Sequence, residues 1–60
     1  MLSKLKGKRV EKGLTQKELA KLLNIETATY TRKENGLVQF RLDEINKILE
    51  ILQCKFEDIF

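Results

Sequence analysis

The stretch GLTQKELAKLLNI, which spans residues 13–25, decides the fold. Within it, Thr15 precedes a run of helix-forming residues and Glu18 follows three positions later, which is the spacing of a capping box. In that motif the Thr15 side chain accepts from the amide of Glu18, and the Glu18 carboxylate reaches back to the amide of Thr15. The stretch therefore predicts a helix that begins at Thr15. It extends only to about Leu23, because Asn24 tolerates the left-handed conformation that a tight turn requires.

A second helix is expected after this turn, from about Glu26 or Thr27 to Asn35. Threonines and charged residues leave it little apolar surface except Tyr30, which we expect to face the core. Because so polar a helix is only weakly stable by itself, something outside the core must use its exposed face. Gly36 stands at the position where a left-handed glycine commonly ends a helix.

Three further helices are predicted, over residues 3–12, 42–52 and 56–59, from apolar residues that recur at helical spacing. Gly13 follows the first of them, where a left-handed cap is expected. Residues 37–41 form a loop. Since proline is absent and alternating patterns are nearly so, the chain is predicted to be a compact all-α bundle of five helices.

The length of 60 residues and mass of 7.0 kDa allow one domain and exclude a second. A single cysteine excludes an intrachain disulfide framework, and the lack of histidine argues against a zinc site. We expect no cofactor. No apolar run is long enough to span a membrane and no signal peptide is visible, so a cytoplasmic protein is expected.

The net charge of +3 is distributed unevenly. Residues 1–12 carry five basic side chains against one acidic, whereas residues 37–60 carry three basic against five acidic. A basic front and an acidic back suggest one side that faces a polyanion, with an ordinary solvated surface as the alternative.

The combined pattern resembles the Cro and repressor type of phage helix-turn-helix DNA-binding proteins, the XRE family. The match lies in the start of the first helix of the motif and the end of the second: Thr15, Gln16, Glu18, Leu19, Ala20, Glu34, Asn35 and Gly36. Residues 42–60 also resemble the family's last two helices. The resemblance implies a five-helix, lambda-repressor-like domain over residues 1–60, with its helix-turn-helix at about 15–35.

Four features depart from the family pattern. Asn24 replaces the common turn glycine, and Glu26 stands where a small capping residue is usual, although its carboxylate can cap a helix. Lys33 holds a position that is often apolar. Residues 37–40 lack the basic side chains that often touch phosphate there. These departures bear on affinity for a target and not on the fold.

The resemblance and the helical spacing together assign base contacts to one side of the helix at 27–35. Thr27 and Thr31 lie one turn apart, as do Ala28 and Arg32. Arg32 can donate two hydrogen bonds to guanine O6 and N7, and the threonine and alanine methyl groups can pack on thymine methyls. The alternative is a mediocre helix that is merely exposed.

Phosphate contacts are assigned to five residues. Gln16 can donate its amide to a phosphate at the start of its helix, as the glutamine commonly does in the family. Asn35 would donate its main-chain N–H, and Thr29 lies near the backbone or is partly packed. For Lys33 and Arg41, an ordinary solvated charge is an equally good interpretation.

The family pairs the positions of Arg9 and Glu34 in a partly buried salt bridge, so the resemblance implies a structural role for both. Cys54 occupies a place that is apolar in the family, which favours a small core residue over a nucleophile. With no histidine to act as a base, the sequence gives no support to an enzyme.

The expected function is a sequence-specific, Cro-like repressor that acts by occupying an operator. Double-stranded DNA with a palindromic site is the expected partner, bound by a weak homodimer that assembles on the DNA. The surface nominated for the dimer consists of Gln53, Cys54, Lys55, Phe56 and Phe60, although the two phenylalanines could simply close the core. The alternative is a protein-interaction adaptor or antirepressor, which the apolar loop at 37–40 and the modest charge favour.

Overall fold

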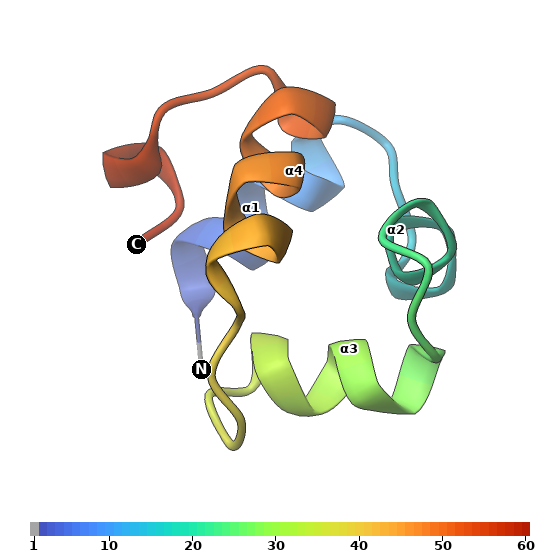
Figure 1. The fold of residues 1–60 in the computed structure, drawn as a ribbon. Helices are drawn as coiled ribbons and strands as arrows, with labels where there is room; N and C mark the ends of the chain where they lie inside the picture. Colours follow the sequence, from blue (N-terminus) through green and yellow to red (C-terminus); the bar gives the residue numbers. More distant parts are fainter. Residues whose placement is uncertain (1) are drawn as a thin grey trace.

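The structure is a computed structural model that describes residues 2–60, and it is built from helices (Figure 1). In chain order the elements are α1 (Ser3–Glu11), α2 (Gln16–Leu22), α3 (Thr27–Glu34), α4 (Leu42–Leu52) and the 3-10 helix η1 (Phe56–Asp58). The predicted all-α class is confirmed, and each α-helix begins and ends within one residue of its expected bounds. The expected fifth helix is a single 3-10 turn that ends one residue early.

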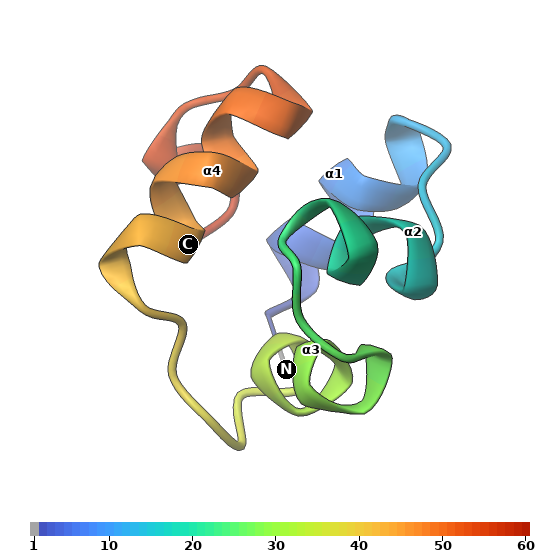
Figure 2. The same ribbon diagram turned by 45° about the vertical axis from the view of Figure 1, so that its right-hand side comes forward.

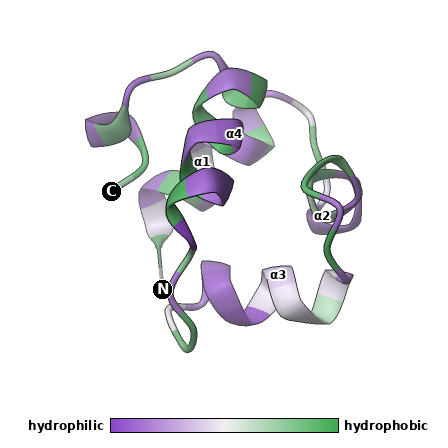
Figure 3. Cartoon of the chain, viewed as in Figure 1, coloured by the Kyte–Doolittle hydropathy of each residue, from purple (hydrophilic) through white to green (hydrophobic). Residues whose placement is uncertain are grey.

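The arrangement leaves one side of α3 open. In Figures 1 and 2, α3 forms one edge of the molecule, and α1, α2 and α4 all lie to one side of it. Figure 3 colours most of α3 purple or white, so this edge is polar, as the sequence predicts. A helix in this position buries one face and presents the other to whatever lies outside.

The core joins all four α-helices and the segment after α4. Its fully or almost fully buried apolar residues are Leu5, Leu19, Ala20, Leu23, Tyr30, Ile48, Leu52 and Ile59. Tyr30 is the residue that α3 contributes, in agreement with the prediction that it faces the core, and it belongs to the same cluster as Leu19 and Leu23. Burial of this one large side chain ties an otherwise polar helix to the fold.

Local signals in the sequence set the ends of α2 and the turn after it. Glu18 N donates to Thr15 Oγ1 at 3.0 Å and Thr15 N donates to Glu18 Oε1 at 2.9 Å, so the capping box is confirmed. The predicted left-handed conformations are present at Gly13, with φ 76°, and at Asn24, with φ 59°. They let α1, α2 and α3 follow one another through short turns.

Two details differ from expectation. Glu26 precedes α3 with an extended backbone, and its carboxylate, which could have capped the helix, forms no capping hydrogen bond. Gln53, with φ 52°, ends α4 in a left-handed conformation that the sequence did not indicate. Cys54 follows it, half-buried against the core, and burial raises the pKa of its thiol. No helix within residues 2–60 has the length and apolar character needed to cross a membrane.

Candidate nucleic-acid interface

The open side of α3 carries three of the four predicted base readers. Thr27, Ala28 and Arg32 are exposed, and Thr31 is half-buried. Tyr30 points the other way and is fully buried. The structure thus brings Thr27, Ala28 and Arg32 to the surface of one short helix, while their contact with bases stays a prediction.

Behind this surface, Glu34 fastens α3 to α1 and α2. Arg9 donates to both of its carboxylate oxygens, from Nε to Oε2 at 2.9 Å and from Nη2 to Oε1 at 3.2 Å. Tyr30 donates its hydroxyl to Oε2, and Gln16 donates Nε2 to Oε1 at 3.0 Å. The salt bridge implied for Arg9 and Glu34 is present, with both side chains buried.

This network keeps Glu34 charged. Burial acts to raise the pKa of Glu34, but hydrogen bonds from Arg9, Tyr30 and Gln16 outweigh it, so the pKa lies below its ordinary value. Burial also raises the pKa of Tyr30, which keeps the phenol protonated as a donor. Because a charged acceptor strengthens each of these bonds, the end of α3 is held firmly in place.

Gln16 and Thr31 form a contact that the sequence analysis missed. Thr31 Oγ1 donates to Gln16 Oε1 at 3.0 Å. Since Gln16 Nε2 already donates to Glu34, the amide retains one donor hydrogen for a phosphate. The donor hydrogen of Thr31 is used within the protein, so its methyl group is the part best suited to a base. No spacing rule links positions on different helices, so the sequence carried no signal of this contact.

Lys33 does not lie where a phosphate contact would need it. Its side chain is buried, and its Nζ is 2.6 Å from Glu44 Oε1 on α4. The same carboxylate accepts from Arg41 N at 2.8 Å. Both predicted alternatives for Lys33, a phosphate contact and a solvated charge, are therefore corrected, because its ammonium group belongs to a buried ion pair.

The three remaining predicted phosphate contacts are Asn35, Arg41 and Thr29, and the structure supports them to different degrees. Asn35 is exposed, but its main-chain N–H donates to the carbonyl of Thr31 at 3.0 Å. The last turn of α3 thus uses the donor that was expected to reach a phosphate, and that expectation is corrected. Arg41 is exposed and donates Nη2 to Asp43 at 3.1 Å. Thr29 is half-buried, and its predicted contact stays a prediction.

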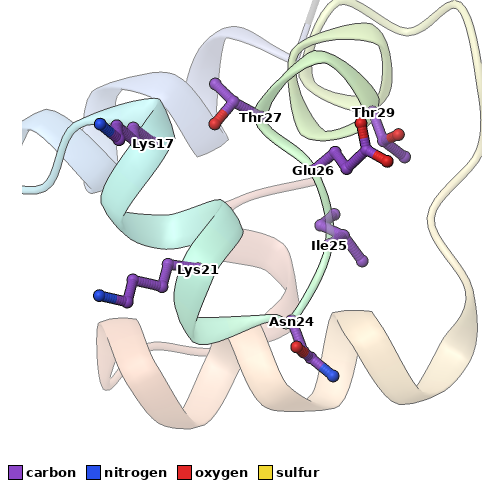
Figure 4. A pocket seen from close by; sticks show the side chains of 7 residues that line it. All are labelled: Lys17, Lys21, Asn24, Ile25, Glu26, Thr27 and Thr29. Carbon is purple, nitrogen blue, oxygen red and sulfur yellow. The ribbon is translucent and has the colours of Figure 1, made fainter.

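Two surface hollows flank the start of α3 and are lined by lysines that are not among the five predicted phosphate contacts. Lys17 and Lys21 of α2 line the first, together with Thr27, and Figure 4 shows both lysines leaving the same side of α2. Lys6 and Lys17 line the second, which also includes Thr27 and the residues at the start of α2. The separation of Lys17 and Lys21 by four positions was the available signal.

Nothing within residues 2–60 suggests a metal site, because no three histidine, cysteine, aspartate or glutamate side chains gather there. The groups that converge around α3 are instead ammonium, guanidinium, amide and hydroxyl groups. These are the groups with which proteins contact the phosphates and base edges of DNA.

Comparison with known proteins agrees with this chemistry. The sequence model of the Cro/C1-type HTH DNA-binding domain matches residues 4–60, which is nearly the whole chain. The searches of curated proteins and of solved structures gave no match.

Proposed function

We propose, since the chain belongs to the family of Cro/C1-type HTH DNA-binding domains, that this protein is a sequence-specific, Cro-like repressor that acts by occupying an operator. One observation carries the proposal. Thr27, Ala28 and Arg32 are exposed on α3, although Tyr30 and Glu34 of the same helix are buried and Glu34 is bonded to Arg9 and Gln16 on the neighbouring helices. A rigidly held helix with a free polar face suits insertion into the major groove.

Within the groove, some side chains contact bases and others contact the sugar-phosphate backbone. Arg32 donates to guanine O6 and N7, and Ala28 and the methyl groups of Thr27 and Thr31 pack on thymine methyls. Gln16 donates its free amide hydrogen to a phosphate, and Thr29 lies beside the sugar-phosphate backbone. The bonds that fix Gln16 to Glu34 and Thr31 support this, because they fix the phosphate donor relative to the base readers.

A palindromic operator bound by two copies follows from the small footprint of one α3. A single recognition helix reads too few base pairs to find one site in a genome. Two copies that enter successive major grooves, about 34 Å apart, solve this problem. Phe56 supports a contact surface after α4, because it is 51% exposed while stacking on Phe60 at a centroid distance of 4.9 Å. Phe60 itself packs against the core.

The experiment that tests the proposal is selection of bound sequences from a random duplex pool, with the Arg32→Ala variant as control. We expect the wild type to enrich one palindrome with half-sites about one helical turn apart. The variant should lose preference at one base pair of each half-site. A pool without any enriched sequence after repeated selection would overturn the proposal.

The recovered duplex then tests the dimer. Sedimentation of the protein with the palindrome should give two protomers per duplex, and with one half-site scrambled, one. Because the nominated surface is small, the free protein should sediment mainly as a monomer. One protomer per intact palindrome at saturation would contradict the dimer.

A protein-interaction adaptor is the second candidate, favoured by the loop after α3. Leu37 and Leu42 are 76% and 74% exposed, and Val38 between them is also exposed. Apolar side chains so exposed on a small domain commonly mark contact with another protein. Binding to duplex DNA at low salt separates the two functions, since a regulator must bind and an adaptor need not.

A further inference from the structure

The positive charges beside α3 are distributed unevenly between its two ends. Of the 12 lysines and arginines in the chain, the ion pairs within residues 2–60 engage Lys8, Arg9, Lys33 and Arg41. The last two of these belong to the C-terminal end of α3 and the loop after it. Residues 37–40 of that loop carry no charge. In the part of the chain that the structure describes, Arg32, which is assigned to a base, is thus the one cation of the C-terminal half of α3 and the loop after it that no ion pair engages.

The N-terminal end of α3 has the opposite character. Lys6, Lys17 and Lys21 are exposed there, and the structure gives none of them an ion pair within residues 2–60. They line two hollows, the first of which is drawn in Figure 4, and the two hollows adjoin because both include Lys17 and Thr27. Three lysines from α1 and α2 therefore surround the N-terminal end of α3, where Thr27 and Ala28 lie.

The spacing of two of these lysines fits a DNA strand. Lys17 and Lys21 are four residues apart on α2, a rise of about 6 Å. One strand of B-DNA presents a phosphate about every 3.4 Å along its axis. The flexible side chains can thus reach two phosphates of one strand, while Lys6 of α1 lines the second hollow together with Lys17 and Thr27.

We propose that Lys6, Lys17 and Lys21 form a one-sided clamp on the phosphodiester backbone of duplex DNA, and that the loop after α3 adds no phosphate contact. This proposal rests on the DNA-binding function and says where its electrostatic part lies. The clamp leaves the apolar loop at 37–40 free of the backbone. Glu26 lines the same hollow as Lys17 and Lys21. Because its carboxylate and a phosphate carry like charges, Glu26 weakens the binding of DNA there.

Salt dependence of binding tests the clamp, because each phosphate contact contributes about −0.9 to the slope of log affinity against log salt. We will compare binding of a random-sequence duplex at 50 and 200 mM salt. Over this fourfold change in salt, each phosphate contact multiplies the loss of affinity by about 3.5. Each of Lys6→Gln, Lys17→Gln and Lys21→Gln should therefore lose about 3.5-fold less affinity per protomer than the wild type does, and the triple variant about 40-fold less. Glu26→Gln should strengthen binding at both concentrations.

Lys47→Gln, which removes an exposed lysine from α4, is the matched control and should keep the wild-type slope. Arg41→Gln tests whether the clamp is one-sided, because Arg41, which pairs with Asp43, is the predicted phosphate contact of the loop region. The proposal expects this variant also to keep the wild-type slope. If Arg41→Gln lowers the slope as much as Lys17→Gln does, the clamp is not one-sided and the proposal falls.

The outcomes also separate this proposal from the function on which it rests. A wild type that binds no duplex even at 50 mM salt would overturn the DNA-binding function itself. A wild type that binds with a steep salt slope, together with a triple variant of unchanged slope and unchanged thermal unfolding, would overturn the clamp alone. All three lysines are exposed, so the variants should fold as the wild type does.

Discussion

Arg32 is the exposed side chain of α3 with the greatest power to distinguish bases, since a guanidinium can satisfy both acceptors of guanine. We expect Arg32→Ala to lose about 1–3 kcal/mol of binding free energy on the selected site and little on random DNA. Titration of both duplexes measures the difference. An equal loss on both would assign Arg32 to the phosphates.

A double-mutant cycle tests the contribution of the salt bridge between Arg9 and Glu34 to stability. Removal of either partner leaves a buried charge without compensation, which costs about 3–5 kcal/mol, close to the whole stability of so small a domain. Arg9→Met combined with Glu34→Leu should cost much less than the sum of the single changes. Denaturant unfolding gives the four free energies, and additivity would show that the pair does not interact. Glu34→Leu leaves the hydroxyl of Tyr30 without its acceptor. The cycle is therefore repeated with Tyr30→Phe in all four proteins, which removes this hydroxyl.

The two buried ion pairs show what could be predicted at the level of single residues. Arg9 and Glu34 occupy positions that the family pairs, so the sequence was sufficient for them. Lys33 was placed at the DNA because its partner Glu44 belongs to another helix, beyond a loop whose path the sequence does not specify. The hydrogen bond from Thr31 to Gln16 was missed for the same reason.

At the level of the helices, Gly7 offers a clean test. It lies inside α1, and a Cβ built there meets nothing within 4 Å. Because glycine is costly in a helix interior, Gly7→Ala should raise the free energy of unfolding by about 0.5–1 kcal/mol. Gly13→Ala is the matched control, expected to destabilise because φ is +76° there. Urea unfolding measures both, and a destabilising Gly7→Ala would refute the argument.

Helix limits were predictable wherever a single residue type sets the backbone. The capping box at Thr15 and the left-handed residues at Gly13, Asn24 and Gly36 all behave as their chemistry requires. Gln53 was not foreseen, because glutamine has no marked preference for the left-handed region that it adopts there. The last helix was foreseen in place but not in type, since a three-residue segment is too short to separate a 3-10 turn from an α-helical one.

For the molecule as a whole, two depressed carboxyl pKa values predict acid sensitivity. Burial acts to raise the pKa of Glu44, but bonds from Lys33 and the Arg41 amide outweigh it, and the pKa is lowered, as it is for Glu34. A carboxyl whose pKa is lower in the folded state contributes stability above its unfolded pKa, about 4.3, and loses it as pH falls through the folded value. Stability should therefore fall steadily below about pH 4.5.

Glu44→Gln measures how much the ion pair between Lys33 and Glu44 contributes to this loss of stability at low pH. The variant should be less stable than the wild type at pH 7, and the gap should narrow as the pH falls below about 4.3, where Glu44 of the unfolded wild type becomes protonated before Glu44 of the folded protein does. Thermal unfolding at several pH values measures the gap. A gap that stays constant down to pH 3 would show that the pKa of Glu44 is not depressed by folding.

The carboxylate of Glu34 has one more consequence, for how the protein opens. It accepts from Arg9 of α1, Gln16 of α2 and Tyr30 of α3, and the carbonyl of Glu34 accepts from the amide of Leu2 at 2.8 Å. No one of these three helices can detach without leaving a buried charge short of donors. The first three helices thus form a single cooperative unit, and native-state hydrogen exchange should show their innermost amides released together, at one common opening free energy.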